Sequence, residues 1–340
     1  EESWIGVKCI NKKRKKAIFL TLAAIILLLF VILAVVLFFN RTNFKEEFPY
    51  NKSIQAFGTS AKEDALVAPG LASNLCVGED FTQMEGIQSI SEEMAGFFSL
   101  SERSIPFSNH LYEKVEPGKI TQLMTVLLAA EHLNPEEEIV IEEDDRVYGK
   151  GVRSCGLRQG YHVTVKQLLN AVIISSAEDA CQALARLTSG SQESFVSLMN
   201  EKAAALGMTN THFTNATGYS SEEQYITVYD IYLLLNEFLK YPDLLNAMSL
   251  SDYTMSYTTE KGELKQQWLD GDNLFTTGKV TIPKDVTILG GKTFTSKSSN
   301  YAALLTQNNY GEFYISIVFH ANTEGALIER ISEMLTQTNR

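Results

Sequence analysis

The sequence predicts an α+β domain, in which an antiparallel sheet is flanked by helices and further helices form a helical subdomain. Apolar residues make up 45% of the 340 residues and aromatic residues 10%, which is ample for a packed core. After about residue 84, segments with strand periodicity stand at both ends and segments with helical periodicity fill the middle. One domain with a helical insertion explains this order better than two independent domains.

The N-terminal region predicts a membrane anchor. Residues 17–39 form a run of 23 residues without a charge, long enough to span a hydrocarbon core of about 30 Å. Residues 1–16 carry six lysines and arginines against two glutamates, which places this end in the cytoplasm by the positive-inside rule. A cleaved signal peptide is the competing interpretation, but the run is too long and no small-residue cleavage site follows. We expect a single-pass helix in the cell membrane, an extracytoplasmic linker at 40–83 and a domain at 84–340.

The charge and the cysteines exclude several classes of function. The formal net charge is −12, and nucleic-acid binding needs a basic surface, so we expect no nucleic-acid partner. The four cysteines and five histidines show no metal-ligand spacing. Cys9 precedes the predicted span, which leaves an odd number of cysteines beyond it. We expect buried or free thiols, no disulfide framework, and neither a metal nor a cofactor.

The domain begins with two short strands and a helix. Residues 95–100 and 104–114 predict strands joined by a polar turn. Residues 119–133 predict a helix, because their apolar side chains recur at the spacing of one helical face. Residues 136–145 predict a short strand within an acidic stretch that faces solvent.

Helices dominate the middle of the domain. Residues 164–188 predict two helices that are interrupted near Ser175 and Ser176. Residues 191–207 begin with a capping pattern and predict a further helix. Residues 227–242 predict another, which Pro242 stops.

Strands return in the last part of the chain. Residues 285–291, 300–307 and 312–320 predict strands, and residues 323–337 predict a final amphipathic helix. Strands on both sides of the helical region are expected to meet in one sheet.

Five segments resemble one family, the serine D-alanyl-D-alanine carboxypeptidases (peptidase S11), which are low-molecular-mass penicillin-binding proteins. The resemblance runs from about residue 86 to 338 and is carried by "HLYEKVEPGKITQLMT", "VRSCGLRQGYHVTVKQLL", "SSAEDACQALA", "FVSLMNEKAAALGMTNTHFTNATG" and "GGKTFTS". It implies the serine β-lactamase/penicillin-binding-protein fold and a place in a bacterial envelope.

The resemblance also implies a chemistry. In this family a serine at a helix N-terminus attacks a terminal D-Ala-D-Ala peptide, and a lysine three residues later takes its proton. A Ser-x-Asn element lines the opposite wall. A Lys-Thr-Gly strand binds the substrate carboxylate, and its glycine lets the substrate approach. Two backbone N–H groups, one at the nucleophile and one just past Lys-Thr-Gly, form the oxyanion hole.

The first motif falls at "PGKITQLMT", Pro117 to Thr125. The resemblance puts Lys119 at the position of the nucleophile and Gln122 at that of the base. An amide formed on a lysine would not turn over, and glutamine has no basic lone pair at neutral pH. No lysine of the chain follows a serine by three residues, so a shifted alignment does not supply the pair.

The second motif falls at Ser176-Ala177-Glu178. The serine is kept, but Glu178 replaces the family's asparagine, and its carboxylate would repel the carboxylate of a substrate. Lys119 and Glu178 would lie on facing walls of the cleft, so we expect an ion pair between them; the alternative is that both side chains point to solvent. A new nucleophile at Ser176 with Glu178 as its base is a further alternative.

The third motif falls at Lys292 and Thr293, where the family's glycine is missing and Phe294 and Thr295 follow directly. We assign Phe294 and Thr295 to the substrate cleft. Losing one residue from a strand reverses the facing of all later residues unless a bulge absorbs the change. Phe294 would also obstruct the pairing of a substrate with the strand.

Damage to all three motifs predicts a pseudoenzyme with no functional catalytic residues. We expect it to act in the envelope by binding a protein partner or a peptidoglycan peptide through the remodelled cleft, held to the membrane by residues 17–39. The alternative is an active serine-type D-Ala-D-Ala carboxypeptidase that trims peptidoglycan stem peptides.

Overall fold

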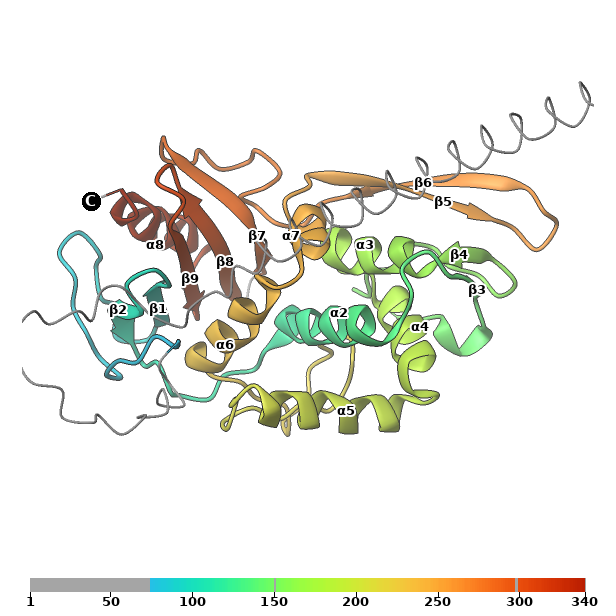
Figure 1. Cartoon of the computed structure of the whole chain (residues 1–340), viewed down its shortest axis with the longest axis horizontal. Helices are drawn as coiled ribbons and strands as arrows, with labels where there is room; N and C mark the ends of the chain where they lie inside the picture. The colour runs from blue at the N-terminus through green and yellow to red at the C-terminus, as the bar shows by residue number, and fades with distance from the viewer. Residues whose placement is uncertain (1–73, 150, 297–298, 340) are drawn as a thin grey trace, which may run out of the picture. The chain divides into compact units, whose positions relative to one another are not determined.

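The computed structural model of the chain describes residues 74–149, 151–296 and 299–339 (Figure 1). All of these belong to one compact unit. The predicted membrane span at 17–39 lies outside the described residues and stays a prediction. Within the described part of the chain, no helix is long and apolar enough to cross a bilayer.

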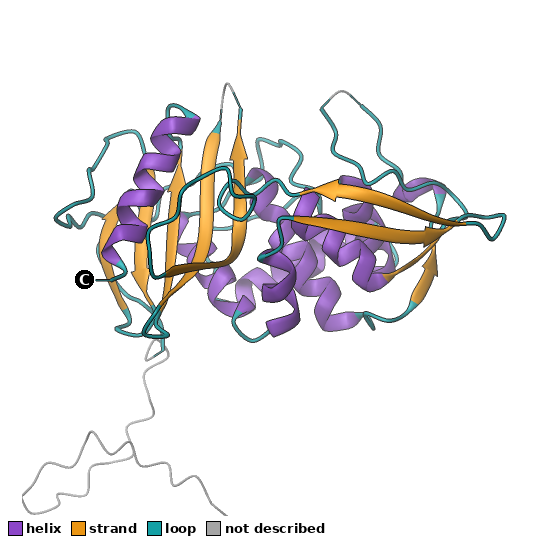
Figure 2. Cartoon of the chain, turned by 90° about the horizontal axis from the view of Figure 1, so that it is seen from above, coloured by secondary structure: helices purple, strands orange, loops and turns teal. Residues whose placement is uncertain are grey.

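A five-stranded antiparallel sheet forms one layer of the domain, in the order β2-β1-β9-β8-β7. Its strands are β1 (Met94–Ser99), β2 (Ser104–Asn109), β7 (Val286–Thr295), β8 (Asn300–Asn308) and β9 (Phe313–Phe319). Helix α8 (Glu324–Gln337) covers one face, and α6 (Val228–Phe238) packs on the other (Figure 2). Side chains along each strand alternate between the hydrophobic cores on the two faces.

A helical subdomain lies beside this sheet. Its helices are α2 (Thr121–His132), α3 (Val165–Ser175), α4 (Glu178–Ser189), α5 (Gln192–Ala205) and α7 (Pro242–Met248). Helix α2 is central, because it contacts α3, α4, α5 and α6 and its residues from Thr121 to Ala129 are all buried. The 3-10 turn η2 (Gly118–Ile120) leads into it.

A smaller antiparallel sheet borders the helical subdomain, in the order β3-β4-β5-β6. Its strands are β3 (Glu138–Val140), β4 (His162–Thr164), β5 (Asp252–Thr258) and β6 (Leu264–Asp270), and the 3-10 turn η3 (Glu143–Asp145) follows β3. Strands β5 and β6 form a long ribbon that extends across the helices (Figure 1).

The strands and helices predicted from periodicity are confirmed, and three features are added: β4, the β5–β6 hairpin and α7. Periodicity missed the hairpin because all but one of the β6 side chains are exposed, which leaves no alternation of buried and exposed residues. Pro242 ends the helix before it, as predicted, but it also begins α7, where its missing N–H is tolerated.

Residues 74–83, which the sequence assigns to the linker, lie against the domain. The Cys76 N–H donates to the Tyr232 hydroxyl at 2.8 Å, and the Tyr229 hydroxyl donates to the Cys76 carbonyl at 2.9 Å. The described domain therefore begins before residue 84.

A buried ion pair joins α8 to the start of the sheet. Arg330 Nε lies 3.0 Å from Glu93 Oε2, and the two side chains are 3% and 2% exposed. Burial raises the pKa of Glu93, and the hydrogen bond from Arg330 opposes that rise. Arg330 also contacts Glu333, one turn further along α8.

Replacing Arg330 with methionine is expected to lower the free energy of unfolding by about 3–5 kcal/mol, because it leaves the Glu93 carboxylate buried without its partner. The double variant R330M/E93Q should recover a large part of this loss. Urea denaturation of the three proteins measures both quantities. A loss below about 1 kcal/mol in the single variant would show that the pair is not needed for stability.

Candidate active site

Lys119 lies in η2, just before α2, and its side chain pairs with Glu178. The distance from Lys119 Nζ to Glu178 Oε1 is 2.5 Å, and the side chains are 14% and 8% exposed. The ion pair expected from the sequence is therefore present, and the solvent-facing alternative is wrong. Glu178 is the first residue of α4, where the helix dipole favours a carboxylate. Its carboxylate also accepts from the Arg153 N–H at 3.4 Å.

The backbone N–H of Lys119 is also bonded within the chain. It donates to the Tyr301 hydroxyl at 2.6 Å. Tyr301 is a buried residue of β8, stacked between Phe294 and Phe319 with ring centroids 5.4 and 4.8 Å away, and burial raises the pKa of its hydroxyl. The resemblance assigns this N–H to the oxyanion hole. The Tyr301 hydroxyl therefore occupies the N–H group that would bind the oxyanion.

Gly118 makes room for this contact. A Cβ atom at Gly118 would lie 2.3 Å from the Tyr301 hydroxyl oxygen, and the residue has φ of +49°, which disfavours other side chains. The turn before Lys119 is therefore shaped to receive the tyrosine.

Gln122 is fully buried and bridges two walls of the site. Its Nε2 donates to the Ser176 carbonyl at 3.3 Å and to the Thr217 carbonyl at 3.1 Å. Its Oε1 is buried and has no hydrogen-bond partner within the described residues. An amide that donates to two carbonyls holds the walls together, and it cannot take a proton.

Lys292 extends from β7 into the helical subdomain, where it is 1% exposed. Its Nζ donates to the Val172 carbonyl at 2.7 Å, the Ile173 carbonyl at 2.9 Å and Ser176 Oγ at 2.8 Å. These three contacts match the three donors of an ammonium group. Burial lowers the pKa of Lys292, and Asp272, at 4.0 Å, opposes that shift.

Ser176 links Lys292 to Asp272. It caps the C-terminus of α3 in the left-handed conformation, with φ of 55°, which is uncommon for a residue other than glycine. Its Oγ donates to Asp272 Oδ2 and accepts from Lys292. Its partners are therefore Asp272 and Lys292, whereas the sequence-based alternative pairs it with Glu178.

Asp272 was not identified from the sequence. It follows β6, contacts Arg153 Nη1 at 3.5 Å, and completes a chain of charges from Lys292 to the surface. No motif marks it, and it reaches Ser176 across a separation of 96 residues. An acid directly after a glycine at a strand end is too common a pattern to indicate a site.

The Thr293 and Thr295 hydroxyls are bonded to other parts of the chain than Lys119. Thr293 Oγ1 donates to the Asp272 carbonyl at 3.1 Å and accepts from the Leu274 N–H at 3.0 Å. Thr295 Oγ1 donates to Glu324 of α8 at 2.9 Å. The substrate-cleft assignment of Thr295 therefore has no support from its contacts.

Phe294 pairs with Tyr301 in the β7–β8 register, which runs without a break from Gly290 to Thr295. The irregularity in this pairing lies earlier, between Ile288 and Gly290. Phe294 lies on the same face as Lys292 and stacks on Tyr301, which accepts from the Lys119 N–H.

Five of the predicted residues converge at one place: Lys119, Gln122, Ser176, Glu178 and Lys292.

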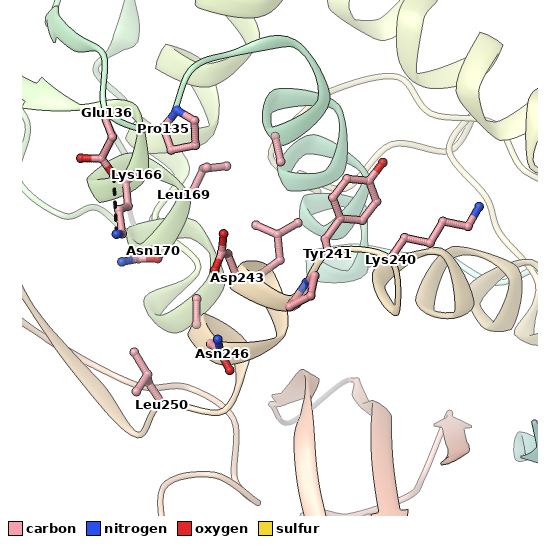
Figure 3. A pocket seen from close by; sticks show the side chains of 14 residues that line it. Pro135, Glu136, Lys166, Leu169, Asn170, Lys240, Tyr241, Asp243, Asn246 and Leu250 are labelled. Carbon is pink, nitrogen blue, oxygen red and sulfur yellow. Dashed lines mark ion pairs between the residues drawn. The ribbon is translucent and has the colours of Figure 1, made fainter. Parts of the chain in front are cut away.

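A separate pocket of about 680 Å³ lies between α3 and α7 (Figure 3). Leu169, Leu244 and Ala247 line its apolar part, and the Glu136–Lys166 ion pair, at 3.7 Å, lies at its rim. None of the residues predicted for the site lines it.

The arrangement of sheet and helical subdomain is that of the DD-peptidase class. The structure resembles the Streptomyces K15 DD-transpeptidase with a TM-score of 0.67 and 20% identity, over 74% of this chain and 98% of that one. It resembles a penicillin-binding protein homologue from Mycobacterium tuberculosis with a TM-score of 0.63 and 17% identity, over 74% and 92%. These likenesses confirm the predicted antiparallel α+β fold.

The chain belongs to the D-alanyl-D-alanine carboxypeptidase family, whose pattern matches residues 103–323. It is 29% identical over 233 residues to the D-alanyl-D-alanine carboxypeptidase DacF of Bacillus subtilis, covering 67% of this chain and 57% of that protein. It is 27% identical over 241 residues to DacC of Escherichia coli, covering 66% and 55%. The chain therefore spans a little over half the length of these relatives.

Removing either member of the Lys119–Glu178 pair is expected to lower the free energy of unfolding by about 3 kcal/mol, because the remaining charge loses its partner in a largely buried place. Urea denaturation of K119M, E178Q and the double variant gives the coupling energy, expected to exceed about 1 kcal/mol.

The exposed Lys166–Glu136 pair is the matched control. Its side chains are 61% and 76% exposed, so the same double-mutant cycle with K166M and E136Q should give a coupling below about 0.5 kcal/mol. Equal coupling in the two cycles would contradict the role given to the Lys119–Glu178 pair.

Proposed function

We propose that this chain is a catalytically inactive member of its family, which acts in the bacterial cell envelope by binding. The observation that carries the proposal is the state of Lys119. A lysine stands at the nucleophile position, its ammonium group pairs with Glu178 at 2.5 Å, and its N–H is bonded to Tyr301 at 2.6 Å. A serine hydrolase needs a free nucleophile and a free oxyanion donor at this position.

The base position supports the same proposal. Gln122 cannot accept the proton of an attacking group, and both of its hydrogen bonds within the described residues are donated to backbone carbonyls. Lys292 cannot replace it, since its three donors are all engaged. Ser176 donates its own proton to Asp272 and is fully buried. Ser176 is therefore not accessible to a substrate, and Lys119 has no base at position 122.

We propose that the occupant of the remodelled cleft is a protein partner or a peptidoglycan peptide. Family membership supports a cell-wall role. Residues 17–39 are proposed to hold the chain in the membrane as a single-pass helix with its N-terminus in the cytoplasm.

An active serine-type carboxypeptidase is the second candidate. It is favoured by the similarity to enzymes named D-alanyl-D-alanine carboxypeptidases in Bacillus subtilis and Escherichia coli. Its weakness is the absence of a serine at position 119.

Incubation with a fluorescent penicillin is expected to leave the chain without covalent label, because no serine stands where the acyl-enzyme bond forms. Denaturing gel electrophoresis reads the label, with DacF of Bacillus subtilis as the positive control. Release of D-alanine from a peptide ending in D-Ala-D-Ala should likewise stay at the level of buffer. Covalent label that disappears in S176A or K119A would establish a working nucleophile and support the second candidate.

A further inference from the structure

Strand β6 is an edge strand that no described strand covers. It is the last strand in the order β3-β4-β5-β6, and its pairing within the described residues is with β5 alone. That pairing runs over seven residues, from Asp252↔Asp270 to Thr258↔Leu264, without a bulge. The row of N–H and C=O groups on its other edge is therefore available to a further strand.

The side chains of β6 are unusual for such an edge. All of its residues except Leu269 are exposed. Leu264 and Trp268 are 72% and 56% exposed, and because they are four residues apart they lie on the same face of the ribbon. Proteins protect exposed edges with proline, bulges or charge; β6 contains no proline and no bulge, and its two charged residues are Lys265 and Asp270.

The charge of this segment permits contact between copies. Lys265 Nζ pairs with Glu263 Oε2 at 3.0 Å, so residues 263–269 carry no net charge. The chain as a whole carries −12, so two copies repel each other on average. Segment 263–269 therefore adds no net charge to a contact between two copies.

We propose that two copies of this chain associate through β6, which pairs antiparallel with β6 of the second copy. A two-fold axis perpendicular to the ribbon passes through the Gln266 pair and joins β5–β6 of one copy to β6–β5 of the other in one four-stranded ribbon. This association is independent of the proposed function of the cleft.

The register follows from the side chains. With Gln266 on the axis, Leu264 lies opposite Trp268 of the second copy, and the symmetry repeats this apolar pair on the other side of the axis. With Gln267 on the axis, Leu264 would lie opposite Asp270 instead. With Lys265 on the axis, two like charges would be opposed. Among these registers, only the first pairs the two exposed apolar side chains with each other.

A cysteine at position 266 tests the proposal in the full chain, purified in a mild detergent. Opposed residues of an antiparallel pair have Cβ atoms about 4.5–5.5 Å apart, close enough for a disulfide to form. Cys76, Cys155 and Cys181 are buried, and the wild-type chain gives the background from the remaining thiol. Mild oxidation of Q266C should give a covalent dimer on a non-reducing gel.

The matched control is T254C. Thr254 lies on β5 opposite Trp268 and is exposed on the same face, but three strand spacings and an offset of four residues would separate its copies by about 20 Å. We expect at least about tenfold more dimer from Q266C than from T254C. Equal yields would overturn the proposal.

The register is tested by adding Trp268→Glu to Q266C. Trp268 is exposed in the single chain, so the thermal unfolding midpoint should be unchanged, which checks that the variant is folded. Loss of both apolar pairs is expected to lower the dimer yield at limiting concentration about tenfold. An unchanged yield would show that Leu264 and Trp268 are not opposed and would overturn the register.

Discussion

The buried ammonium group of Lys292 is the interaction on which the arrangement of the site depends. A charged group that is 1% exposed needs hydrogen-bond partners, since an unpaired charge in this place would cost several kcal/mol. The last turn of α3 provides two carbonyls, and Ser176 provides a hydroxyl. These bonds join the edge strand β7 to the helical subdomain. Ser176, in its left-handed conformation, in turn donates to Asp272.

Around this centre, groups that would act on a substrate are bonded to the chain itself. The Lys119 ammonium meets Glu178, the Lys119 N–H meets Tyr301, and the Gln122 amide meets two carbonyls. An enzyme of this class keeps such donors free and aimed at the charge that develops in the transition state. Here the same groups are bonded to other parts of the folded chain. A ligand that entered would have to break an ion pair and displace a stacked tyrosine.

The motifs were enough to predict that Lys119 and Glu178 meet, because the resemblance to the family places these two residues on facing walls of the site. Periodicity was enough for the strands and helices with one buried face. Tyr301 and Asp272 were missed for a physical reason. Tyr301 reaches Lys119 across 182 residues, Asp272 reaches Ser176 across 96, and neither lies within a motif. Contacts of this kind arise from tertiary packing and leave no local pattern. The β5–β6 hairpin was missed because its exposed strand lacks alternation.

Hydrogen exchange at the Lys119 amide tests most directly whether the site is closed by its own side chains. This N–H has no backbone acceptor among the described residues, so Tyr301 alone accounts for its protection. The account predicts slow exchange by NMR in the wild-type chain and at least about tenfold faster exchange in Y301F. Exchange of the wild-type amide at the rate of an unprotected peptide would contradict it, because the oxyanion donor would then be free.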